Sequence, residues 1–484
     1  MYSILRDIFG HHQFRGRQQD IIERLVGSVS RRDHVLVLMP TGGGKSLCYQ
    51  LPALMFEGGT LVVSPLIALM QDQVDALRRR NVAATFINST VGRDDRDERL
   101  QGFVEGRYKL LYITPERFRK PDFVAGIQRA RIDLMAVDEA HCISEWGHDF
   151  RPDYARLGEF RRMIGSPLTI ALTATATPEV QRDILHRLDL DPAETLVAHQ
   201  GIDRPNLRLE VCEIMSEGEK IERIAGILER CAGSVVVYFA LISTLERFSQ
   251  ILGDRGFRHE VYHGKLDAPS RKRSGRRFLS GEARLVLATN AFGMGVDKPD
   301  IRSIIHVEVP SSIESYYQEI GRAGRDGGAS LCILLYDQED LAIQMDFVRW
   351  SNPGAGFYAR LYGLLAGHGK DINQLGYDML REELNFKNRR DFRLETALGM
   401  LDRWSVTEGS LDDRNLRLVG DLPDHLQDDE ILEEKLRRDN MKLLTMVRYV
   451  RGEGCRRTFI SDYFGFPGAP PCGNCDGCDA QVDD

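Results

Sequence analysis

The sequence predicts an α/β protein with two parallel-sheet domains in tandem, followed by a helical segment that ends in a hairpin and by a small cysteine-rich module. Short apolar runs alternate with amphipathic helical patterns in two separate series, residues 353–424 lose that alternation, and four of the nine cysteines lie between Cys455 and Cys478. A chain of 484 residues also exceeds what one hydrophobic core accommodates, so several domains are expected.

The first series occupies residues 33 to about 190 and contains six runs that are rich in apolar and β-branched residues. They are HVLVLM (34–39), TLVVS (60–64), ATFI (84–87), KLLYIT (109–114), IDLMAVD (132–138) and LTIALT (168–173). Because helical patterns separate these runs, they predict βα units that build a parallel sheet. The stretch LDPAETLVAHQGIDRP at 190–205 is predicted to be a linker.

The second series begins after that stretch and continues to about residue 340. Its runs are LRLEVCE (207–213), SVVVYFA (234–240), HEVYH (259–263), ARLVLAT (283–289), SIIHVEV (303–309) and SLCILLY (330–336). The same alternation predicts a second parallel sheet. We therefore expect one domain over residues 1–200 and another over 201–350.

Residues 353–424 are predicted to form a winged-helix-like α+β segment. Three helical patterns, FYARLYGLLAG (357–367), DINQLGYDMLREEL (371–384) and RRDFRLETALGMLDRW (389–404), precede VTEGSLDDRNLRLVG (406–420), which has the pattern of two strands around a turn. A long helical pattern at 428–451 then leads to the first clustered cysteine. Residues 428–484 are expected to form a separate helical module.

Composition excludes some functional classes. The chain is 42% hydrophobic and 28% charged, its mean hydropathy is −0.30, and no apolar run is long enough to cross a bilayer. The opening MYSILRDIFGHH lacks the pattern of a secretory signal, so a cytoplasmic location is expected. With a net charge of −8, affinity for a polyanion would depend on local basic patches, for which the candidates are residues 78–80, 271–277 and 387–393.

A phosphate-binding loop is predicted in MPTGGGKSLCYQ (39–50), which follows an expected strand and precedes an expected helix. Thr41 and the three glycines Gly42, Gly43 and Gly44 can bring backbone N–H groups close to an anion. Lys45 can reach the β- and γ-phosphates, and Ser46 can hold Mg²⁺ at the start of the helix. The first position of the usual pattern is Met39 instead of glycine.

Two adjacent carboxylates, Asp138 and Glu139, follow the expected strand IDLMAV. The carboxyl ends of parallel strands are where α/β sheets bind ligands, so both side chains are expected beside the phosphate loop. Asp138 would orient the Mg²⁺ shell, and Glu139 would position or deprotonate the water that attacks the γ-phosphate.

Positive charge for the transition state is expected from SYYQEIGRAGRDG (315–327) in the second domain. Arg322 and Arg325 are three residues apart and would share one face if this segment were helical. Both are predicted to act as arginine fingers at the interface of the two domains. Catalysis would then depend on the approach of one domain to the other.

The clustered cysteines, Cys455, Cys472, Cys475 and Cys478, have the spacing of a closed tetrahedral Zn²⁺ site, which would be structural rather than catalytic. An iron–sulfur cluster, free thiols and disulfides are the alternatives. The other five cysteines lie singly in or beside apolar segments and are expected to be buried thiols in a reducing compartment.

The motifs together resemble those of the RecQ family of DNA helicases, in helicase superfamily 2. The resemblance is carried by FGHHQFRGRQ (9–18), PTGGGKSLCYQLPAL (40–54), SPLIALMQDQV (64–74), DEAHCISEWGHDFRPDY (138–154), TATATP (173–178), ATNAFGMGVDKPDIRSIIH (288–306) and QEIGRAGRDG (318–327). It implies that both sheet domains are RecA-like and extends to the terminal cysteines.

The resemblance also implies roles for individual residues. Arg15 and Gln18 would recognise adenine, which makes ATP the nucleotide, and Asp297 and Gln318 would add contacts to the nucleotide site. An aromatic-rich loop directly after the acidic pair would contact single-stranded DNA; its candidate residues are Trp146, His148, Phe150 and Arg151. Stacking on bases tolerates any base sequence and contributes about 1–3 kcal/mol per base, so such a loop can sense DNA without reading it.

The resulting hypothesis is an ATP-driven DNA helicase that translocates 3′ to 5′, acts on single-stranded and forked DNA as a monomer, and needs ATP, Mg²⁺ and Zn²⁺. One alternative is a translocase or junction remodeller without processive strand separation. Another is a DNA-binding scaffold in which ATP serves only as a conformational ligand.

Overall fold

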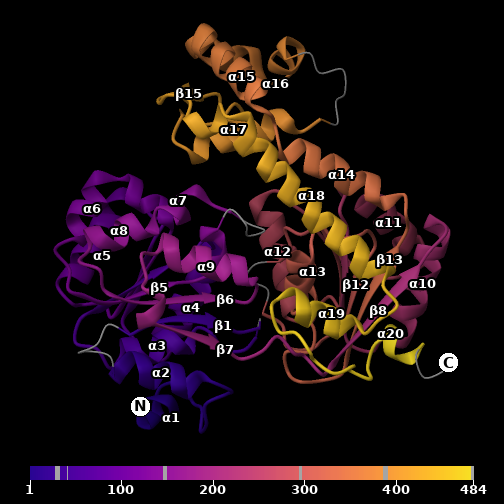
Figure 1. The fold of residues 1–484 in the computed structure, drawn as a ribbon, viewed down its shortest axis with the longest axis horizontal. Coiled ribbons are helices and arrows are strands. Elements are labelled where there is room, and N and C mark those ends of the chain that lie inside the picture. The colour runs from indigo at the N-terminus through magenta and orange to yellow at the C-terminus, as the bar shows by residue number, and fades with distance from the viewer. Residues whose placement is uncertain (28–32, 41, 145–149, 294–296, 385–390, 481–484) are drawn as a thin grey trace. The chain divides into compact units, whose positions relative to one another are not determined.

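The computed structural model describes the chain except for residues 28–32, 41, 145–149, 294–296, 385–390 and 481–484. The chain divides into two compact units (Figure 1). Unit 1 comprises Met1–Glu308, Glu314–Leu335 and Gly452–Asp484, and unit 2 comprises Val309–Ile313 and Tyr336–Arg451. Among the described residues, no helix is both long and apolar enough to span a membrane.

The first sheet of unit 1 has seven parallel strands in the order β3-β4-β2-β5-β6-β1-β7. The strands are β1 (His34–Leu38), β2 (Gly59–Val63), β3 (Ala84–Ile87), β4 (Leu110–Ile113), β5 (Ile132–Val137), β6 (Leu168–Thr173) and β7 (Thr195–His199). The predicted parallel sheet is therefore confirmed. All five residues of β1 are buried, as expected for a central strand covered on both faces.

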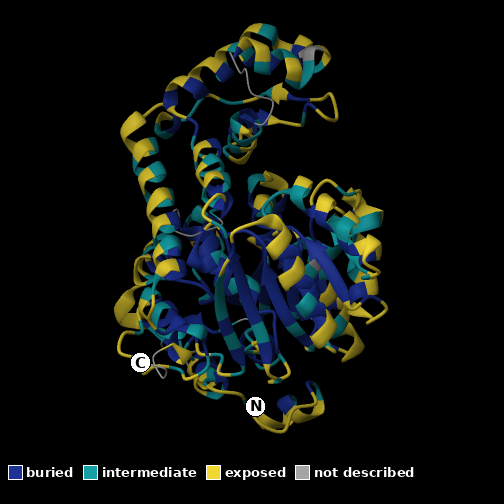
Figure 2. Ribbon diagram, turned by 90° about the vertical axis from the view of Figure 1, so that its right-hand side faces the viewer, coloured by how far each residue is buried: buried dark blue, intermediate teal, exposed yellow. Residues whose placement is uncertain are grey.

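Helices cover both faces of this sheet, and alternate residues of its strands point to opposite cores. One core joins strand residues such as Val35 and Val62 to α1 (Tyr2–Asp7), α2 (Gln18–Gly27), α3 (Leu47–Ala53) and α4 (Ile67–Arg79). The other joins Leu36 and Leu61 to α5 (Arg93–Val104), η2 (Pro115–Arg119), α6 (Pro121–Ile127), η3 (Ala140–Ile143), α7 (Pro152–Ala155), α8 (Leu157–Met163) and α9 (Pro178–Arg187). Figure 2 shows the buried strands in dark blue and exposed outer helix faces in yellow.

The prediction of a linker at 190–205 is wrong for part of that stretch. After a short 3₁₀ turn, η4 (Pro192–Glu194), β7 pairs in parallel with β1 along its whole length, from His34 opposite Thr195 to Leu38 opposite His199. As an edge strand, β7 buries only part of its residues. Its short run lacks the continuous apolar pattern of a central strand, and the turn residues around it resemble those of a linker.

The second sheet has six strands in the order β10-β11-β9-β12-β13-β8. They are β8 (Leu207–Glu213), β9 (Ser234–Tyr238), β10 (Glu260–Tyr262), β11 (Leu285–Ala288), β12 (Ile301–His306) and β13 (Ser330–Tyr336), and the intervening helices are α10 (Glu217–Arg230), α11 (Ile242–Asp254), α12 (Ala268–Leu279) and α13 (Ile313–Ile320). Ser216 and Asp267 cap α10 and α12 by accepting from the backbone N–H of the third helical residue. All six predicted runs form strands.

The C-terminal residues of unit 1 pack beside β8. They contain the helices α19 (Arg456–Tyr463) and α20 (Asp476–Asp479), and a single parallel β-bridge joins Leu209 of β8 to Cys475. The isolated bridge fixes the cysteine-rich segment against the second sheet.

Unit 2 contains the helices and hairpin expected from the sequence, in the expected order. Its elements are α14 (Asp340–Ser351), α15 (Ala355–His368), η5 (Gly369–Asp371), α16 (Ile372–Glu383), α17 (Arg393–Arg403), the antiparallel pair β14 (Thr407–Glu408) and β15 (Arg417–Leu418), η6 (Asp424–Leu426) and α18 (Asp429–Arg451). Leucines from α15, α16 and α17 share one core with residues of the hairpin region. Helix α16 is kinked at Gly376, where φ is +71°.

Candidate nucleotide, DNA and metal sites

The phosphate loop lies between β1 and α3, and its backbone needs glycine at two positions. Gly42 and Gly44 have φ angles of +81° and +80°, a region that other L-residues rarely adopt. The Lys45 ammonium donates to the Met39 carbonyl at 3.2 Å, and the Ser46 hydroxyl accepts from Gln73 Nε2 at 2.9 Å. Both side chains proposed to hold phosphate and Mg²⁺ therefore line this loop, whereas Thr41 lies outside the described residues.

Gln18 connects the predicted adenine-recognition segment to the phosphate loop. Its side chain is 3% exposed, and its carbonyl oxygen accepts from the Arg15 backbone N–H at 2.9 Å. Its amide nitrogen donates to the carbonyls of Gly43 at 3.3 Å and Gly44 at 3.1 Å. A β-carbon at Gly44 would lie 2.4 Å from this nitrogen, so the close approach also requires glycine.

The acidic pair follows β5 at the carboxyl edge of the first sheet. Asp138 is buried, and its backbone N–H donates to the Val63 carbonyl of β2 at 2.9 Å. Burial and the neighbouring Glu139 carboxylate raise the pKa of Asp138 above its usual range, and the Lys45 ammonium opposes that shift. Glu139 has left-handed backbone angles, φ 48° and ψ 47°, a strained conformation that is common at functional sites.

A residue pair that the sequence analysis did not single out joins the acidic pair to the end of β6. His141 is 2% exposed, and its Nδ1 lies 3.0 Å from the Thr173 hydroxyl and 3.4 Å from Glu139 Oε2. The shorter contact, to Thr173, is a hydrogen bond, and among the described residues Glu139 Oε2 has no hydrogen-bond partner. Thr173 is the first residue of the TATATP motif (173–178).

The end of the predicted DNA-contacting loop and the helix after it are anchored to the catalytic edge. Trp146 and His148 lie outside the described residues, whereas Phe150 and Arg151 are half-buried. The Arg151 backbone N–H donates to the Cys142 carbonyl at 2.9 Å, and its guanidinium donates to the Pro65 carbonyl at 3.3 Å. Three residues further on, the Tyr154 hydroxyl donates to the Asp138 carbonyl at 3.1 Å.

Helix α7, just after this loop, is held by an ion pair. Arg119 of η2 donates from both Nε and a terminal nitrogen to the two carboxylate oxygens of Asp153, each at 2.6 Å. The Asp153 side chain is 7% exposed. A bidentate contact of this kind fixes the orientation of the guanidinium relative to the carboxylate as well as the distance between them.

The helical condition for a shared face of the two arginines is not met, because α13 ends at Ile320 and both arginines follow it in turns. Arg322 is 4% exposed and its guanidinium donates to the Gly293 carbonyl. Arg325 donates to Asp297 Oδ1 at 2.6 Å, and burial lowers its pKa. Gly324, at φ +53°, allows one of the turns that follow the helix.

Arg325 lies against the phosphate loop within unit 1. A β-carbon at Gly42 would be 3.2 Å from Arg325 Cγ, so the Arg325 side chain packs against the Gly42 backbone more closely than most larger residues would allow. Asp297, one of the predicted nucleotide contacts, is therefore tied to this arginine, and Gln318 lies half-buried on α13. The phosphate loop and Arg325, one of the two predicted arginine fingers, therefore lie next to each other.

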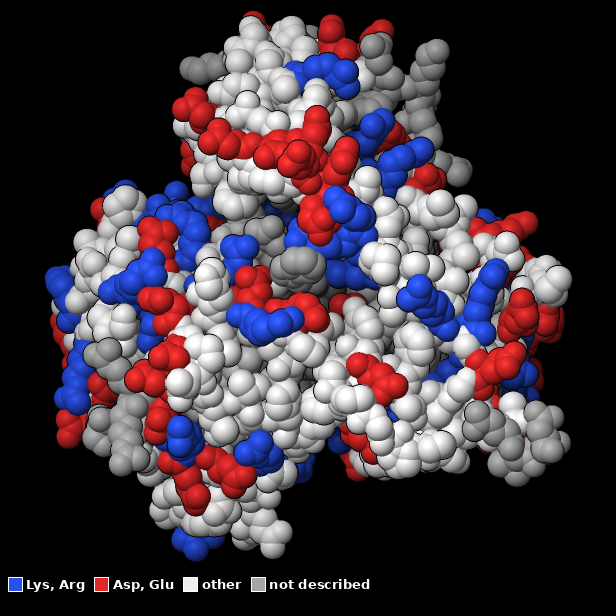
Figure 3. All heavy atoms as spheres, in the orientation of Figure 1, with Lys and Arg blue, Asp and Glu red and all other residues white. Residues whose placement is uncertain are grey.

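Of the predicted basic patches, several residues form contacts within the fold. Arg78 donates to the Ala84 carbonyl at 3.0 Å, Arg277 pairs with Glu260 at 2.5 Å, and Arg393 pairs with Asp391 at 2.8 Å. Residues 387–390 of the third patch lie outside the described residues. Figure 3 shows basic and acidic side chains intermixed over the visible face.

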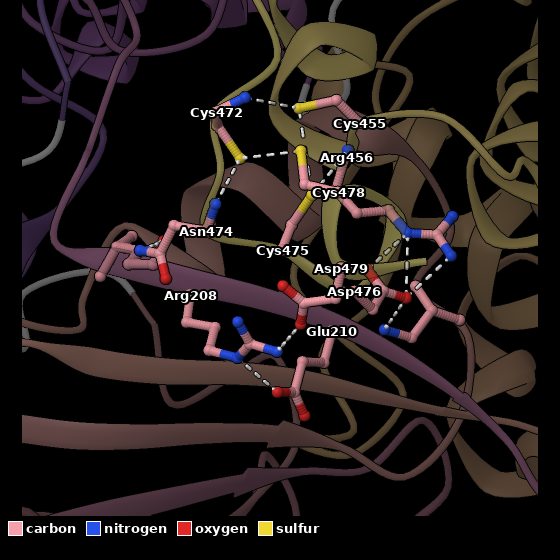
Figure 4. Close-up of polar contacts among 12 residues, drawn as sticks. Arg208, Glu210, Cys455, Arg456, Cys472, Asn474, Cys475, Asp476, Cys478 and Asp479 are labelled. Atoms are coloured by element: carbon pink, nitrogen blue, oxygen red, sulfur yellow. Dashed lines mark hydrogen bonds and ion pairs between the residues drawn. The ribbon is translucent and has the colours of Figure 1, made fainter. Parts of the chain in front are cut away.

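The four clustered cysteines converge with the geometry of a tetrahedral zinc site (Figure 4). Their sulfur atoms all lie within 4.8 Å of one another, and the Cys455–Cys475 and Cys472–Cys478 pairs are each 3.9 Å apart. A tetrahedron with Zn–S bonds of about 2.3 Å has edges of about 3.8 Å. The residues present therefore fit Zn²⁺.

Backbone N–H groups and an ion pair surround the sulfur atoms. The N–H of Cys472 points at Cys455 Sγ, 3.2 Å away, and the N–H of Arg456 points at Cys475 Sγ, 3.4 Å away, as expected for thiolate acceptors. The Arg456 guanidinium donates to the Asp476 carboxylate at 2.9 Å. Asp476 also accepts from the Val211 N–H of β8 at 3.0 Å, which joins the metal site to the second sheet.

Three family models match the chain. Residues 15–184 match the DEAD/DEAH box helicase model, residues 219–327 match the helicase conserved C-terminal domain, and residues 421–479 match the RecQ zinc-binding model. The matches include strands β1–β6 of the first sheet, β9–β12 of the second sheet and the cysteine cluster.

Several curated proteins are similar to the chain over most of its length. The ATP-dependent DNA helicase RecQ of Bacillus subtilis is 45% identical over 72% of the chain and 58% of its own length. The probable ATP-dependent DNA helicase RecS of the same organism is 41% identical over 73% of the chain and 70% of its own length. The ATP-dependent DNA helicase RecQ of Synechocystis sp. is 36% identical over 98% of the chain and 97% of its own length. The chain thus spans little more than half of the first relative and nearly all of the third.

Solved structures share the fold at low sequence identity. Yeast Dbp5 bound to RNA and ADP BeF3 has a TM-score of 0.56 and 15% identity, over 71% of the chain and 89% of Dbp5. The Mycobacterium smegmatis helicase Lhr bound to single-stranded DNA and AMP-PNP has a TM-score of 0.54 and 19% identity, over 85% of the chain and 59% of Lhr. These similarities establish the fold of two RecA-like domains.

Proposed function

The chain belongs to the RecQ family of ATP-dependent DNA helicases, and on that premise we propose that it couples ATP hydrolysis to 3′-to-5′ translocation on single-stranded DNA and to unwinding of forked duplexes. The observation that carries the proposal is the approach of Arg325 to the phosphate loop, where a β-carbon at Gly42 would lie 3.2 Å from Arg325 Cγ. Hydrolysis in a site that two domains share changes their separation, and that change can move DNA.

The phosphate loop would bind the nucleotide through its backbone N–H groups and Lys45. On binding, the Lys45 ammonium exchanges the Met39 carbonyl for phosphate oxygens, because its present contact is a 3.2 Å hydrogen bond to a neutral group. Gln18 already donates to two loop carbonyls, so recognition of adenine would also order the loop. Ser46 and Asp138 are the residues that would hold Mg²⁺, which supplies charge neutralisation on the phosphates.

Glu139 would orient the attacking water and accept its proton. Its backbone is strained, and its Oε2 atom, 3.4 Å from His141 Nδ1, has no hydrogen-bond partner within the described part of the chain, which supports this role. Arg322 and Arg325 would stabilise the charge of the transition state, an effect worth about 10³–10⁵ in rate where an arginine finger acts.

DNA would control hydrolysis through the aromatic-rich loop at 145–151. The Arg151 N–H binds the Cys142 carbonyl and the Tyr154 hydroxyl binds the Asp138 carbonyl, so both contacts lead from the end of that loop to the catalytic edge. A base that stacks on the loop could thereby shift the acidic pair. The zinc site would have a structural role, because four thiolates leave no open coordination position.

A strand-separation assay on a forked duplex tests the function. Wild-type protein should separate a fork with a 3′ single-stranded tail in the presence of ATP and Mg²⁺, and should fail on a duplex with only a 5′ tail. Lys45→Ala and Glu139→Gln should abolish both DNA-stimulated ATPase and strand separation, while DNA binding persists. A wild-type protein that hydrolyses ATP on single-stranded DNA but never separates the fork would instead be a translocase.

DNA stimulation and oligomeric state can be measured on the same protein. Without DNA, hydrolysis by a protein controlled through the 145–151 loop should be slow, and single-stranded DNA should stimulate it more than RNA does. ATPase that is independent of DNA would contradict this control. Analytical ultracentrifugation with and without DNA would test whether the protein acts as a monomer.

A further inference from the structure

Residues 202–207, which we call the connector, lie between two functional parts of unit 1. On one side are residues 321–325, the arginine loop, and on the other are the first residues of α19 and the turn at Asn474, next to the zinc ligands. The Tyr317 hydroxyl of α13 also donates to the Ile202 carbonyl at 2.7 Å. The connector therefore contacts both parts directly.

Arg204 of the connector binds the backbone of the arginine loop at three points. Its guanidinium donates to the carbonyls of Gly321 at 3.1 Å, Ala323 at 2.6 Å and Gly324 at 3.0 Å. These carbonyls flank Arg322 and directly precede Arg325. A planar guanidinium presents several N–H groups in fixed directions, so it can define the path of this backbone in a way that a lysine ammonium cannot.

The backbone of the arginine loop around those carbonyls is held by further hydrogen bonds and requires glycine at position 324. Asn206 donates to the carbonyls of Gly324 at 2.9 Å and Gly328 at 3.0 Å. A β-carbon at Gly324 would lie 2.4 Å from Asn206 Nδ2, and the φ of +53° at Gly324 disfavours other residues. Burial lowers the pKa of Arg204, as expected for a guanidinium whose solvent has been replaced by carbonyl oxygens.

The opposite face of the connector is bound by the zinc module. Arg457, two residues after the ligand Cys455, donates to the carbonyls of Arg204 at 3.2 Å and Leu207 at 2.8 Å. Asn474, directly before the ligand Cys475, donates to the Pro205 carbonyl at 3.2 Å. The backbone of Arg204 is thus fixed by the module while its side chain fixes the arginine loop.

We propose that Arg204 is a positioning residue for ATP hydrolysis, which orients the arginine loop toward the transition state, and that the zinc module holds Arg204 in place through Arg457 and Asn474. This inference rests on the proposed function, because it assigns a cause to the placement of the predicted arginine fingers. It gives the zinc module a role in hydrolysis in addition to local stability. It also predicts that Arg204 acts on the transition state more than on nucleotide binding.

The conservative variant Arg204→Lys tests this proposal in the full-length protein. Displacing a catalytic group by about 1 Å can slow the catalysed reaction about 10²-fold. We therefore expect the kcat of DNA-stimulated ATPase to fall by about 10- to 100-fold. The KM for ATP should change by less than about threefold, because the phosphate loop and Gln18 are untouched. Affinity for ADP with aluminium fluoride, which mimics the transition state, should fall with kcat, whereas affinity for ADP should not.

Arg208→Lys is the matched control. Arg208 lies four residues further along and is half-buried. It pairs with the carboxylates of Glu210 at 2.6 Å and Asp479 at 2.5 Å rather than with the arginine loop. The Arg208→Lys substitution should leave kcat, the KM for ATP, and the affinities for ADP and for ADP with aluminium fluoride unchanged. The zinc content of both variants should match that of the wild type, which separates repositioning from loss of the module.

Arg457→Lys tests the zinc-module end of the same contact series. Arg457→Lys should also lower kcat, by less than Arg204→Lys does, and the protein should retain its zinc. The proposal is overturned if Arg204→Lys leaves kcat unchanged, or if it weakens ADP and the transition-state mimic equally, since that would indicate a general structural role. It is also overturned if Arg457→Lys has no effect on kcat. A wild-type protein without DNA-stimulated ATPase would instead refute the proposed function, before any variant is compared.

Discussion

Replacing Asp476 by asparagine tests whether the ion pair next to the cysteine cluster supports metal binding. Asp476 accepts two hydrogen bonds at 2.9 Å from Arg456 and one at 3.0 Å from the Val211 N–H. The Arg456 side chain is 9% exposed and that of Asp476 is 25% exposed. The substitution keeps the size of the side chain and removes the charge that compensates the guanidinium.

The expected loss can be bounded from this geometry. Removing one partner of a buried ion pair lowers the free energy of unfolding by about 3–5 kcal/mol. Here asparagine retains one acceptor oxygen, and the Gly452 carbonyl still accepts from Arg456 at 2.8 Å, so we expect about 2–3 kcal/mol. Loss of a residue that supports metal ligands typically costs about 10- to 100-fold in affinity, or about 1.4–2.7 kcal/mol, which agrees with that range.

Competition for zinc between the protein and a chromogenic chelator measures the effect. Asp476→Asn should weaken zinc binding by about 10- to 100-fold. Asp479→Asn is the control on the same helix, because Asp479 is 54% exposed and its ion pair with Arg208 should contribute less than about 1 kcal/mol. Equal affinities for wild type and Asp476→Asn, or equal losses in both variants, would refute the role assigned to this ion pair.

Three further predictions concern stability, pH and metal content. Arg119→Ala leaves the nearly buried Asp153 without its bidentate partner and should lower the free energy of unfolding by about 3 kcal/mol, measured by urea titration, whereas the exposed Arg182→Ala should change it by less than about 0.5 kcal/mol. Desolvation would raise the pKa of Asp439, but a nearby lysine and asparagine lower it below its ordinary 3.8, so its stabilising contribution should be present above pH 3.8 and disappear as pH falls through the lower folded value. The unfolding free energies of wild type and Asp439→Asn should therefore differ near neutral pH and converge in acid; a constant difference would contradict the assignment. Cys475→Ser removes a buried ligand, so elemental analysis should find less zinc than the roughly one ion per chain expected for the wild type, and undiminished zinc would contradict the four-cysteine site.

Local patterns in the sequence were enough to predict most of the fold and the chemical groups of the site. The central strands are continuous apolar runs bounded by turns, and each of those predicted forms a strand, because burial on both faces of a parallel sheet demands that composition. The phosphate loop and the cysteine cluster were predictable for a similar reason. Their chemistry requires particular residues at short, fixed spacings.

Some features depend on contacts that the local pattern does not record. Strand β7 has a weak strand pattern and forms because β1 offers an open edge to its backbone groups. The arginines at 322 and 325 follow α13 in turns, and His141 pairs with Thr173, which is 32 positions away. Each of these residues can be read from the sequence, but the distances between them depend on the folded chain.

The sequence by itself determined two parallel sheets, a phosphate loop, an acidic pair at the end of a strand, and four thiols suited to zinc, because each arises from residues close together in the chain. Only the tertiary structure decided that Arg325 meets Gly42, and that the connector joins the zinc module to the arginine loop. Arg204 contacts carbonyls more than 110 residues ahead of it, and its own carbonyl is bound by Arg457, 253 residues away. Such contacts depend on how the sheets pack and on which buried polar groups need hydrogen-bond partners. Neither can be predicted from a short stretch of sequence.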